Sequence, residues 1–269
     1  MIKWVAGASG RIPRIAGSLL AGLVLTAPCS AESGLAQEAH DALEDTVRYF
    51  AAPLHWNEGN WFQFGASVAA IAAAHEFDDN VRNHFVSSST VLDGKDPHSS
   101  RDAIPVAAML VGTWAFAALL QDRDGFEEGR TMLESGALAA LSTSIFKFAA
   151  GRRRPNETTQ VDDWRQSGSS FPSLHVSAAF AIGTVLAESG NDEYRWARRG
   201  IGYGLALATG YARLHDNAHW LSDTVAGAAL GIATAQFTMN RNDDRRRQVS
   251  LNVVPTDGGA ILMISGQPY

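Results

Sequence analysis

The sequence is poor in cysteine, and Cys29 is the single one among 269 residues. It lies near the end of an N-terminal stretch in which three basic residues precede the apolar segment 15–26, a pattern typical of a secretory signal. We expect cleavage after Ala31, with an uncleaved N-terminal anchor as the alternative. Cleavage would leave a chain without thiols, which excludes intramolecular disulfides and cysteine chemistry. Export also implies a bacterial-type cell-envelope location, either periplasmic or membrane-associated.

Positive charge is scarce as well. Lys and Arg number 22 against 28 Asp and Glu, which gives a formal net charge of -6. Proteins that bind nucleic acid need a basic surface to offset the phosphate backbone, so nucleic acid is not an expected partner. A local cluster of basic residues therefore stands out against the acidic background of this chain.

Long apolar runs are the third absence. The mean hydropathy is -0.08, and the apolar segments stay below the roughly 20 residues that a membrane-spanning helix needs. We expect a soluble domain or one bound at a membrane surface, with an integral inner-membrane protein as the alternative.

The chain does contain a series of apolar segments rich in Ala and Gly, with few turn formers inside them. Their length and composition favour helix over strand. They cover residues 61–74, 104–120, 135–146, 176–187, 201–212 and 224–239. The sequence therefore predicts an all-α fold, a bundle of about six helices.

The composition also divides the chain into four parts. We expect a signal or anchor at 1–31, a polar segment at 32–59, the helical domain at 60–240 and a tail at 241–269. The tail begins with the charged run 241–247, which we expect to be a solvated linker. Two short apolar stretches, 249–254 and 260–265, then flank a turn-forming segment and predict a short β-hairpin.

The first block of residues that can support chemistry lies at the end of the third apolar segment. Lys147 closes that segment, and Arg152, Arg153, Arg154 and Pro155 follow. A planar guanidinium binds phosphate oxygens in pairs, and lysine adds a compact charge. The structural alternative is a lysine that complements a helix dipole beside a solvated arginine run.

The second block, Pro172-Ser173-Leu174-His175, is a polar turn followed at once by an apolar helix. We expect Ser173 to cap this helix, whose free backbone N–H groups would form an anion site. His175 would lie in the first turn, close to a bound anion. The alternative is a histidine with an ordinary structural role at a helix start.

The third block contains Arg213, His219 and Asp223. We expect Asp216 or Asn217 to cap a helix that includes His219 and Asp223, whose four-residue spacing would place both side chains on one face. A carboxylate bonded to one imidazole nitrogen leaves the other nitrogen free to attack, as in catalytic triads. An ordinary pair on a helix surface is the alternative.

Together the three blocks resemble the signature of the type 2 phosphatidic acid phosphatase superfamily. That signature is Lys, six residues, Arg-Pro; then Pro-Ser-Gly-His; then Ser-Arg, five residues, His, three residues, Asp. The matching residues are Lys147, Arg154, Pro155, Pro172, Ser173, His175, Arg213, His219 and Asp223. The resemblance extends over about residues 60–240. Two positions depart from it, because Leu174 replaces the family glycine and Ala212 replaces the family serine. A leucine at this position narrows the pocket, which bears on substrate preference.

The resemblance implies a metal-free phosphatase without a cofactor, with its active site at one end of the helical bundle. Lys147, Arg154 and Arg213 would hold the phosphate oxygens, with backbone amides of Ser173 and Leu174 as further donors. His219, oriented by Asp223, would attack phosphorus and form a phosphohistidine. His175 would protonate the leaving alkoxide, and water would then release phosphate.

The expected substrate is a phosphate monoester. We expect a lipid phosphate such as phosphatidate or an isoprenoid diphosphate, which is consistent with membrane association. The alternatives are phosphate transfer to an alcohol acceptor, a vanadium-dependent haloperoxidase, and a non-catalytic envelope protein on the same scaffold. His75-Glu76 is like the opening of a zinc-protease motif, but Asp79 stands where its second histidine would be, so we predict an ordinary helix end.

Overall fold

The computed structural model of the protein describes residues 31–86, 103–120, 123–190, 194–247, 250–256 and 259–265. Apart from Ala31, the predicted signal segment lies outside these ranges. The chain separates into two compact units, one that ends at Glu44 and one that begins at Asp45. The second unit contains all the predicted site residues.

The fold is all-α, as predicted, and the six predicted helices are all present. Their bounds are α2 (Glu58–Glu76), α5 (Ile104–Leu120), α6 (Arg123–Ala150), α7 (Leu174–Glu188), α8 (Arg195–His215) and α9 (Leu221–Arg247). The structure adds α1 (Ala31–Ala51), a 3-10 turn η1 (Ala52–His55) and α3 (Asp78–Phe85). The polar segment before residue 60 is therefore mostly helical, which its mixed composition did not indicate.

The charged run 241–247 is not a linker, as the sequence suggested, but the last turns of α9. Its residues are tied to other helices. Arg241 pairs with Asp45 at 3.2 Å, and the Asn242 amide donates to Thr131 at 2.9 Å and to Glu134 at 3.2 Å. These contacts hold Arg241 and Asn242 against other helices, while Asp243 and Asp244 are exposed.

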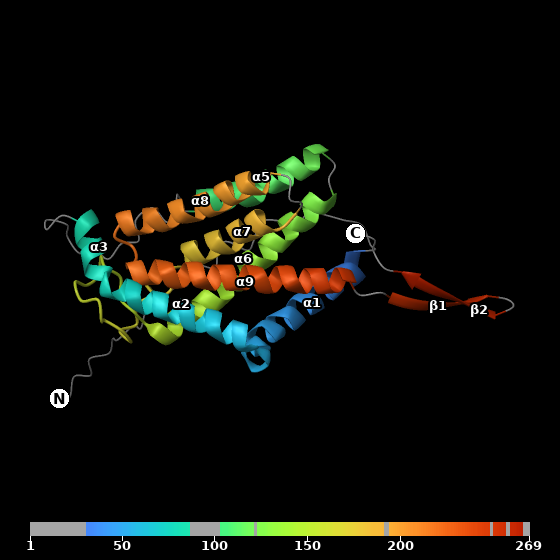
Figure 1. The fold of residues 1–269 in the computed structure, drawn as a ribbon, viewed down its shortest axis with the longest axis horizontal. Coiled ribbons are helices and arrows are strands. Elements are labelled where there is room, and N and C mark those ends of the chain that lie inside the picture. The colour runs from blue at the N-terminus through green and yellow to red at the C-terminus, as the bar shows by residue number, and fades with distance from the viewer. Residues whose placement is uncertain are drawn as a thin grey trace, which may run out of the picture. The chain divides into compact units, whose positions relative to one another are not determined.

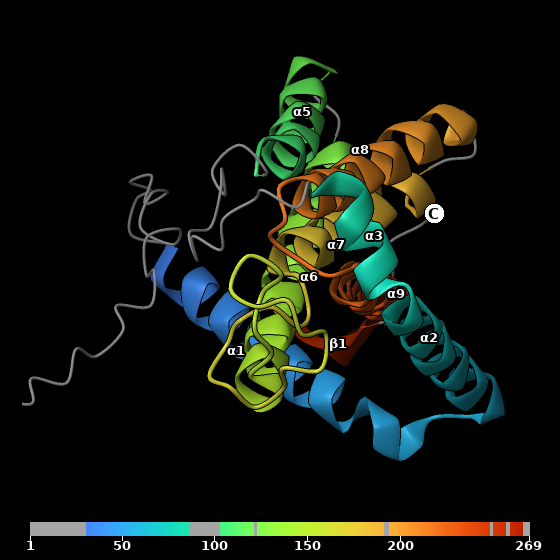
Figure 2. The same cartoon turned by 90° about the vertical axis from the view of Figure 1, so that its left-hand side faces the viewer.

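Helix α7 is the centre of the bundle. It packs most extensively against α9 and α8, and then against α6. Ten of its fifteen residues are buried, so the helix is covered on nearly all sides. Successive helices from α6 to α9 alternate in direction, as Figures 1 and 2 show. The end of α6, the start of α7, the end of α8 and the start of α9 therefore lie at the same end of the bundle.

Glycine allows α7 and α9 to approach closely. A Cβ added at Gly231 of α9 would lie 2.3 Å from the backbone oxygen of Ser177 and 2.9 Å from the backbone nitrogen of Ala181. Backbone atoms cannot move aside as a flexible side chain can. The helices therefore meet at this distance only because residue 231 has no side chain.

The predicted hairpin is present in the tail. β1 (Ser250–Thr256) pairs with β2 (Gly259–Ser265) in antiparallel register, with Ser250 opposite Ser265 and Thr256 opposite Gly259.

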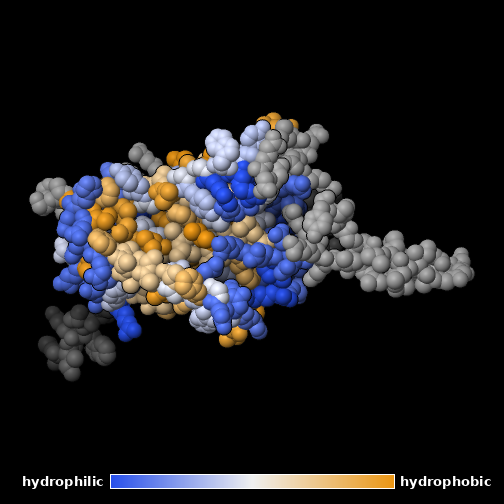
Figure 3. Space-filling model, viewed as in Figure 1, coloured by the Kyte–Doolittle hydropathy of each residue, from blue (hydrophilic) through white to orange (hydrophobic). Residues whose placement is uncertain are grey.

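Large apolar side chains are exposed on several helices of the bundle. Examples are Trp61 on α2, Phe116 on α5, Phe148 on α6 and Leu207 on α8. Figure 3 shows an apolar area flanked by hydrophilic residues on one face. Among the described helices, none combines the length and the apolar character needed to cross a membrane.

We expect Gly231→Ala to lower the free energy of unfolding by about 1–3 kcal/mol, because the new methyl group overpacks the contact between α7 and α9. Thermal or denaturant unfolding measures this change. Gly204→Ala in α8 is the matched control, since a Cβ there meets no atom within 4 Å and alanine favours helix. Equal stability of the two variants would contradict the close approach.

Candidate active site

The alternating helix directions bring the three sequence blocks to one end of the bundle. Lys147 lies in the last turn of α6, and Arg154 lies in the loop that follows. Ser173 precedes α7, and Arg213 lies in the last turn of α8. Asp223 lies in the first turn of α9. Leu174 and His175 are the first two residues of α7, and both are half-buried.

His219 is held in the turn between α8 and α9, not in a helix. α9 begins at Leu221, so the prediction of one helix containing His219 and Asp223 is wrong. The reason is Asn217, whose φ of 54° is left-handed and ends the helical path after α8. The side chain of His219 is only 1% exposed. The pair is formed by a turn that folds back over the start of the next helix.

Asp223 reaches back toward this turn. Its Oδ2 accepts the backbone N–H of Trp220 at 2.9 Å, as the acidic residue of a capping box does. The same oxygen lies 3.4 Å from Nδ1 of His219, which makes no well-aligned hydrogen bond. Catalytic hydrogen bonds are often long or misaligned before substrate binds. The two side chains are thus adjacent, with the carboxylate on the Nδ1 side of the ring.

Positive charge surrounds the imidazole of His219. Burial lowers the pKa of His219 well below its usual value of 6.5, and nearby cationic groups lower it further. These groups are Lys147, Arg154, Arg213 and His175. The predicted phosphate-binding residues and the second histidine therefore lie near His219. A neutral ring amid cations is arranged to meet an anion.

Lys147 and Arg213 are fixed by their surroundings. The ammonium group of Lys147 donates to the backbone oxygen of Ser169 and, at 3.4 Å, to that of Ser170. Arg213 is fully buried in the last turn of α8, where a cation also complements the helix dipole. The position of each cation is thus fixed, that of Lys147 by these hydrogen bonds and that of Arg213 by its burial.

Ser173 differs in two ways from its predicted role. It is the residue before α7, but its side chain makes no capping hydrogen bond. Its backbone N–H donates to the backbone oxygen of Asp223 at 3.0 Å, so the prediction that this amide serves a phosphate is wrong. Among the described residues, its buried hydroxyl has no hydrogen-bond partner. The hydroxyl is therefore the group of Ser173 that can donate to an anion.

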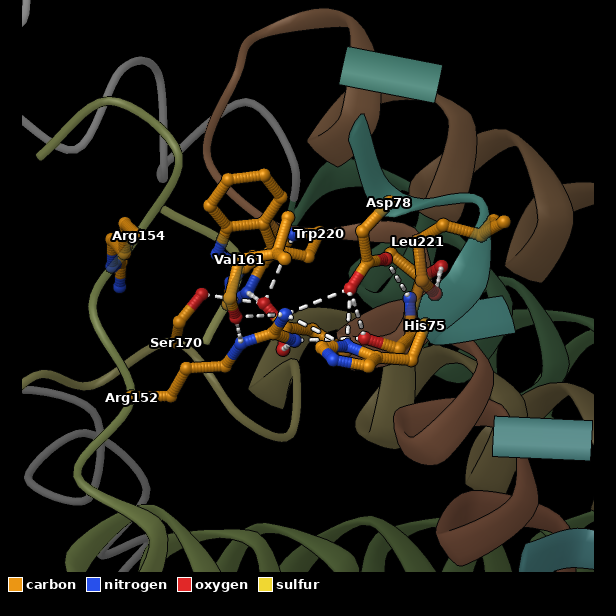
Figure 4. Close-up of polar contacts among 12 residues, drawn as sticks. His75, Asp78, Arg152, Arg154, Val161, Ser170, Trp220 and Leu221 are labelled. Carbon is orange, nitrogen blue, oxygen red and sulfur yellow. Dashed lines mark hydrogen bonds and ion pairs between the residues drawn. The ribbon is translucent and has the colours of Figure 1, made fainter. Parts of the chain in front are cut away.

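A buried network beside His219 contains residues that the sequence did not single out. Arg152 is fully buried and donates to Asp223 Oδ1 at 2.8 Å and to Asp78 Oδ2 at 2.7 Å. Figure 4 shows the Arg152 side chain extending toward Asp78, with Arg154 to one side. Asp78 comes from the start of α3 and also contacts His75 Nδ1 at 2.9 Å. The predicted ordinary helix end at His75 is thus part of an ionic network.

Sequence reasoning had little access to this network. Arg152 is one of three consecutive arginines, and nothing in the run indicates which side chain turns inward. Asp78 lies 74 residues before Arg152, in a polar stretch without a recognisable spacing. The only indication in the sequence was the presence of three consecutive arginines in a chain with a net negative charge.

One group of side chains in the described part of the chain is close enough to bind a metal ion. His40, Asp41 and Glu44 on α1 place their ligand atoms within 4.8 Å of one another. They are at least partly exposed, and exposed acidic groups commonly lie together without a metal. None of them is a predicted site residue.

We expect the His219 ring to be neutral at pH 6.5. As the pH falls through 6.5, the unfolded chain takes up a proton at this residue and the folded chain does not, so the folded state loses stability. ¹⁵N NMR of labelled histidine measures the midpoint of protonation, and Lys147→Met should raise it by removing the cation with the largest effect on the ring. A wild-type ring that is half protonated at pH 6.5 would contradict the electrostatics of the site.

The comparisons with known proteins agree with the three sequence blocks. Residues 129–247 match the model of the PAP2 superfamily. Over 180 residues the chain is 34% identical to lipid A 1-phosphatase of Porphyromonas gingivalis, a match that covers 63% of this chain and 36% of that relative. The chain thus spans about a third of the relative's length.

A solved structure also overlaps the chain. It is the first transmembrane PAP2 type phosphatidylglycerolphosphate phosphatase from Bacillus subtilis, with 17% sequence identity. The overlap covers 77% of this chain and 98% of that one, at a TM-score of 0.40, which is too low to compare the folds in detail. Residues 129–247 thus match the PAP2 superfamily, the type 2 phosphatidic acid phosphatase family that the three blocks of the chain resemble.

Proposed function

We propose that this protein is a metal-independent phosphatase that hydrolyses a lipid phosphate through a phosphohistidine on His219. The observation that carries the proposal is a buried, neutral imidazole with a carboxylate on its Nδ1 side and with Lys147, Arg154 and Arg213 around it. Membership of the PAP2 superfamily supports the same reaction class.

In the proposed reaction, His219 attacks phosphorus through Nε2, because Nδ1 faces Asp223. The P–N bond forms as the bond from phosphorus to the leaving oxygen breaks, and His175 gives that oxygen a proton. The three cations offset the charge on the phosphoryl oxygens in the transition state. Water then attacks phosphorus, and the P–N bond to His219 breaks as the new P–O bond forms. His175 takes a proton from the attacking water, and inorganic phosphate leaves.

A lipid substrate is supported by apolar surface close to these residues. Phe146, Trp164 and Phe171 line an open hollow together with Ala149, Ala150 and Arg165. Phe146 directly precedes Lys147, and Phe171 lies two residues before Ser173. The relative in Porphyromonas gingivalis is by name a phosphatase of lipid A. We therefore propose a long-chain lipid phosphate, such as phosphatidate, an isoprenoid diphosphate or a sugar-linked lipid phosphate, and a site of action in the cell envelope.

The first test is phosphate release from a chromogenic monoester and from a lipid phosphate, both in EDTA. We expect activity that survives chelation, is inhibited by vanadate and falls by roughly 10³-fold or more in His219→Ala. His215→Ala is the matched control, because His215 is exposed and lies four residues earlier. Loss of activity in EDTA, or full activity in His219→Ala, would refute the mechanism.

The second test concerns the role of His175. We expect His175→Ala to lose most activity toward an alkyl phosphate, whose leaving alkoxide needs a proton, and to keep much more toward an aryl ester with an acidic leaving group. The wild-type profile of kcat/KM against pH should be bell-shaped, since His219 must be neutral while His175 is protonated. Equal losses on both esters would remove His175 from the role of general acid.

A further inference from the structure

The buried Arg152 joins two carboxylates that come from distant parts of the chain. Its Nη1 donates to Asp223 Oδ1 at 2.8 Å and to the Ser222 hydroxyl at 2.7 Å. Its Nη2 donates to Asp78 Oδ2 at 2.7 Å and to the backbone oxygen of Val161 at 2.8 Å. Arg152, Asp78 and Asp223 are each fully buried. Each terminal nitrogen of the guanidinium thus has a carboxylate and a second acceptor of its own.

These contacts leave Asp223 a single orientation. Arg152 occupies Oδ1, while Oδ2 receives the Ser170 hydroxyl and the Trp220 backbone N–H and faces Nδ1 of His219. If the carboxylate rotated, it would give up hydrogen bonds in a place that water does not reach, which costs free energy. By binding Oδ1, Arg152 therefore determines that Oδ2 is the oxygen of Asp223 that faces His219.

Asp78 holds both Arg152 and the first turn of α9. Besides binding Arg152, its Oδ1 accepts the backbone N–H of Ser222 at 2.8 Å and its Oδ2 accepts the Ser222 hydroxyl at 2.7 Å. Ser222 is next to Asp223 in the chain. Asp78 also lies outside residues 129–247, the part of the chain that matches the family model. A residue from α3 thus fixes the turn that carries Asp223.

We propose that Asp78 and Arg152 are positioning residues, which fix the Asp223 carboxylate and the start of α9 and thereby hold the His219 ring in its reactive orientation. This inference rests on the proposed function of His219. Stability alone is a weak reason for such a network, because buried ion pairs are often no more stabilising than apolar residues of similar volume. A catalytic pair, in contrast, gains from geometry, since a displacement of about 1 Å can lower the rate roughly 10²-fold.

The test compares Asp78→Asn with Asp79→Asn, the same substitution at the adjacent exposed residue. We expect Asp78→Asn to lower kcat by roughly 10²-fold. KM and inhibition by vanadate should stay unchanged, because Lys147, Arg154 and Arg213 are untouched. ¹⁵N NMR should show a changed Nδ1 signal for His219 in Asp78→Asn and a wild-type signal in Asp79→Asn. A purely structural role would instead change thermal stability and leave kcat of the folded protein intact.

A second pair of variants guards against loss of the fold. Arg152→Lys keeps the buried charge but replaces the planar fork, which serves two carboxylates, by a single ammonium group. Arg153→Lys is its control, since Arg153 is 43% exposed at its side chain. We expect a lower kcat in Arg152→Lys only. If neither Asp78→Asn nor Arg152→Lys folds, the network is structural and the proposal fails.

The positioning role and the proposed function fail in different ways. If wild type and all variants release no phosphate, the proposed function is wrong, and the NMR signal of His219 still reports its position. A His219 signal and a kcat in folded Asp78→Asn that match the wild type would overturn the positioning role while leaving the phosphatase intact.

Discussion

A guanidinium buried between two carboxylates is the interaction on which this end of the bundle depends. Arg152 is fully buried, and its charge is offset by Asp78 and Asp223. An unpaired charge at this depth would cost several kcal/mol, so the three segments that carry these residues must assemble together. The rings of Trp164 and Trp220 also flank the guanidinium, with centroids 4.5 Å and 5.2 Å from its carbon. The loop after α6, the start of α3 and the start of α9 are thereby fixed to one another.

The helices place this network beside the cations Lys147, Arg154 and Arg213, which we propose bind the phosphate. Because α6, α7, α8 and α9 alternate in direction, every second helix end reaches the same side of the bundle. The close approach of α7 and α9 at Gly231 then sets the distance between the segments that carry Ser173 and Asp223. Their backbones are joined directly, since the N–H of Ser173 donates to the oxygen of Asp223. Packing between the helices and geometry at the site are therefore coupled.

The sequence predicted what depends on local composition and on spacing within one block. The all-α fold and the six helices followed from apolar segments, and residues 104–120 match α5 at both ends. The family followed from three spaced blocks and is confirmed. The charged run after residue 240 was misjudged, because its partners Asp45 and Glu134 lie more than a hundred residues away in the chain. The assigned roles of the site residues remain predictions.

Other features could not be predicted because they depend on contacts between distant segments. Four-residue spacing suggested one helix face for His219 and Asp223, but the left-handed Asn217 makes a turn there, and Asp223 reaches back to it. Ser173 was expected to donate its backbone N–H to an anion, but this N–H donates to the backbone oxygen of Asp223 in α9. Arg152 could not be told from Arg153 and Arg154 without knowing that Asp78 is its neighbour. In each case the deciding partner lies on another element.

The basic residues at this end of the bundle fall into two groups with different roles in the proposed mechanism. The charge of Arg152 is offset by carboxylates, and we propose that this residue fixes the geometry of the site. Burial lowers the pKa of His219 most, and Lys147, Arg154 and Arg213 lower it further, so they act on the ring as net positive charge. A neutral histidine is the form that can attack phosphorus, and these cations keep it neutral in the free protein. A bound phosphate ester brings negative charge to the same cations and offsets their effect on the ring. The imidazole then regains basicity at the moment when it must form a bond to phosphorus, so the charges that suppress its protonation without substrate support its reactivity with substrate.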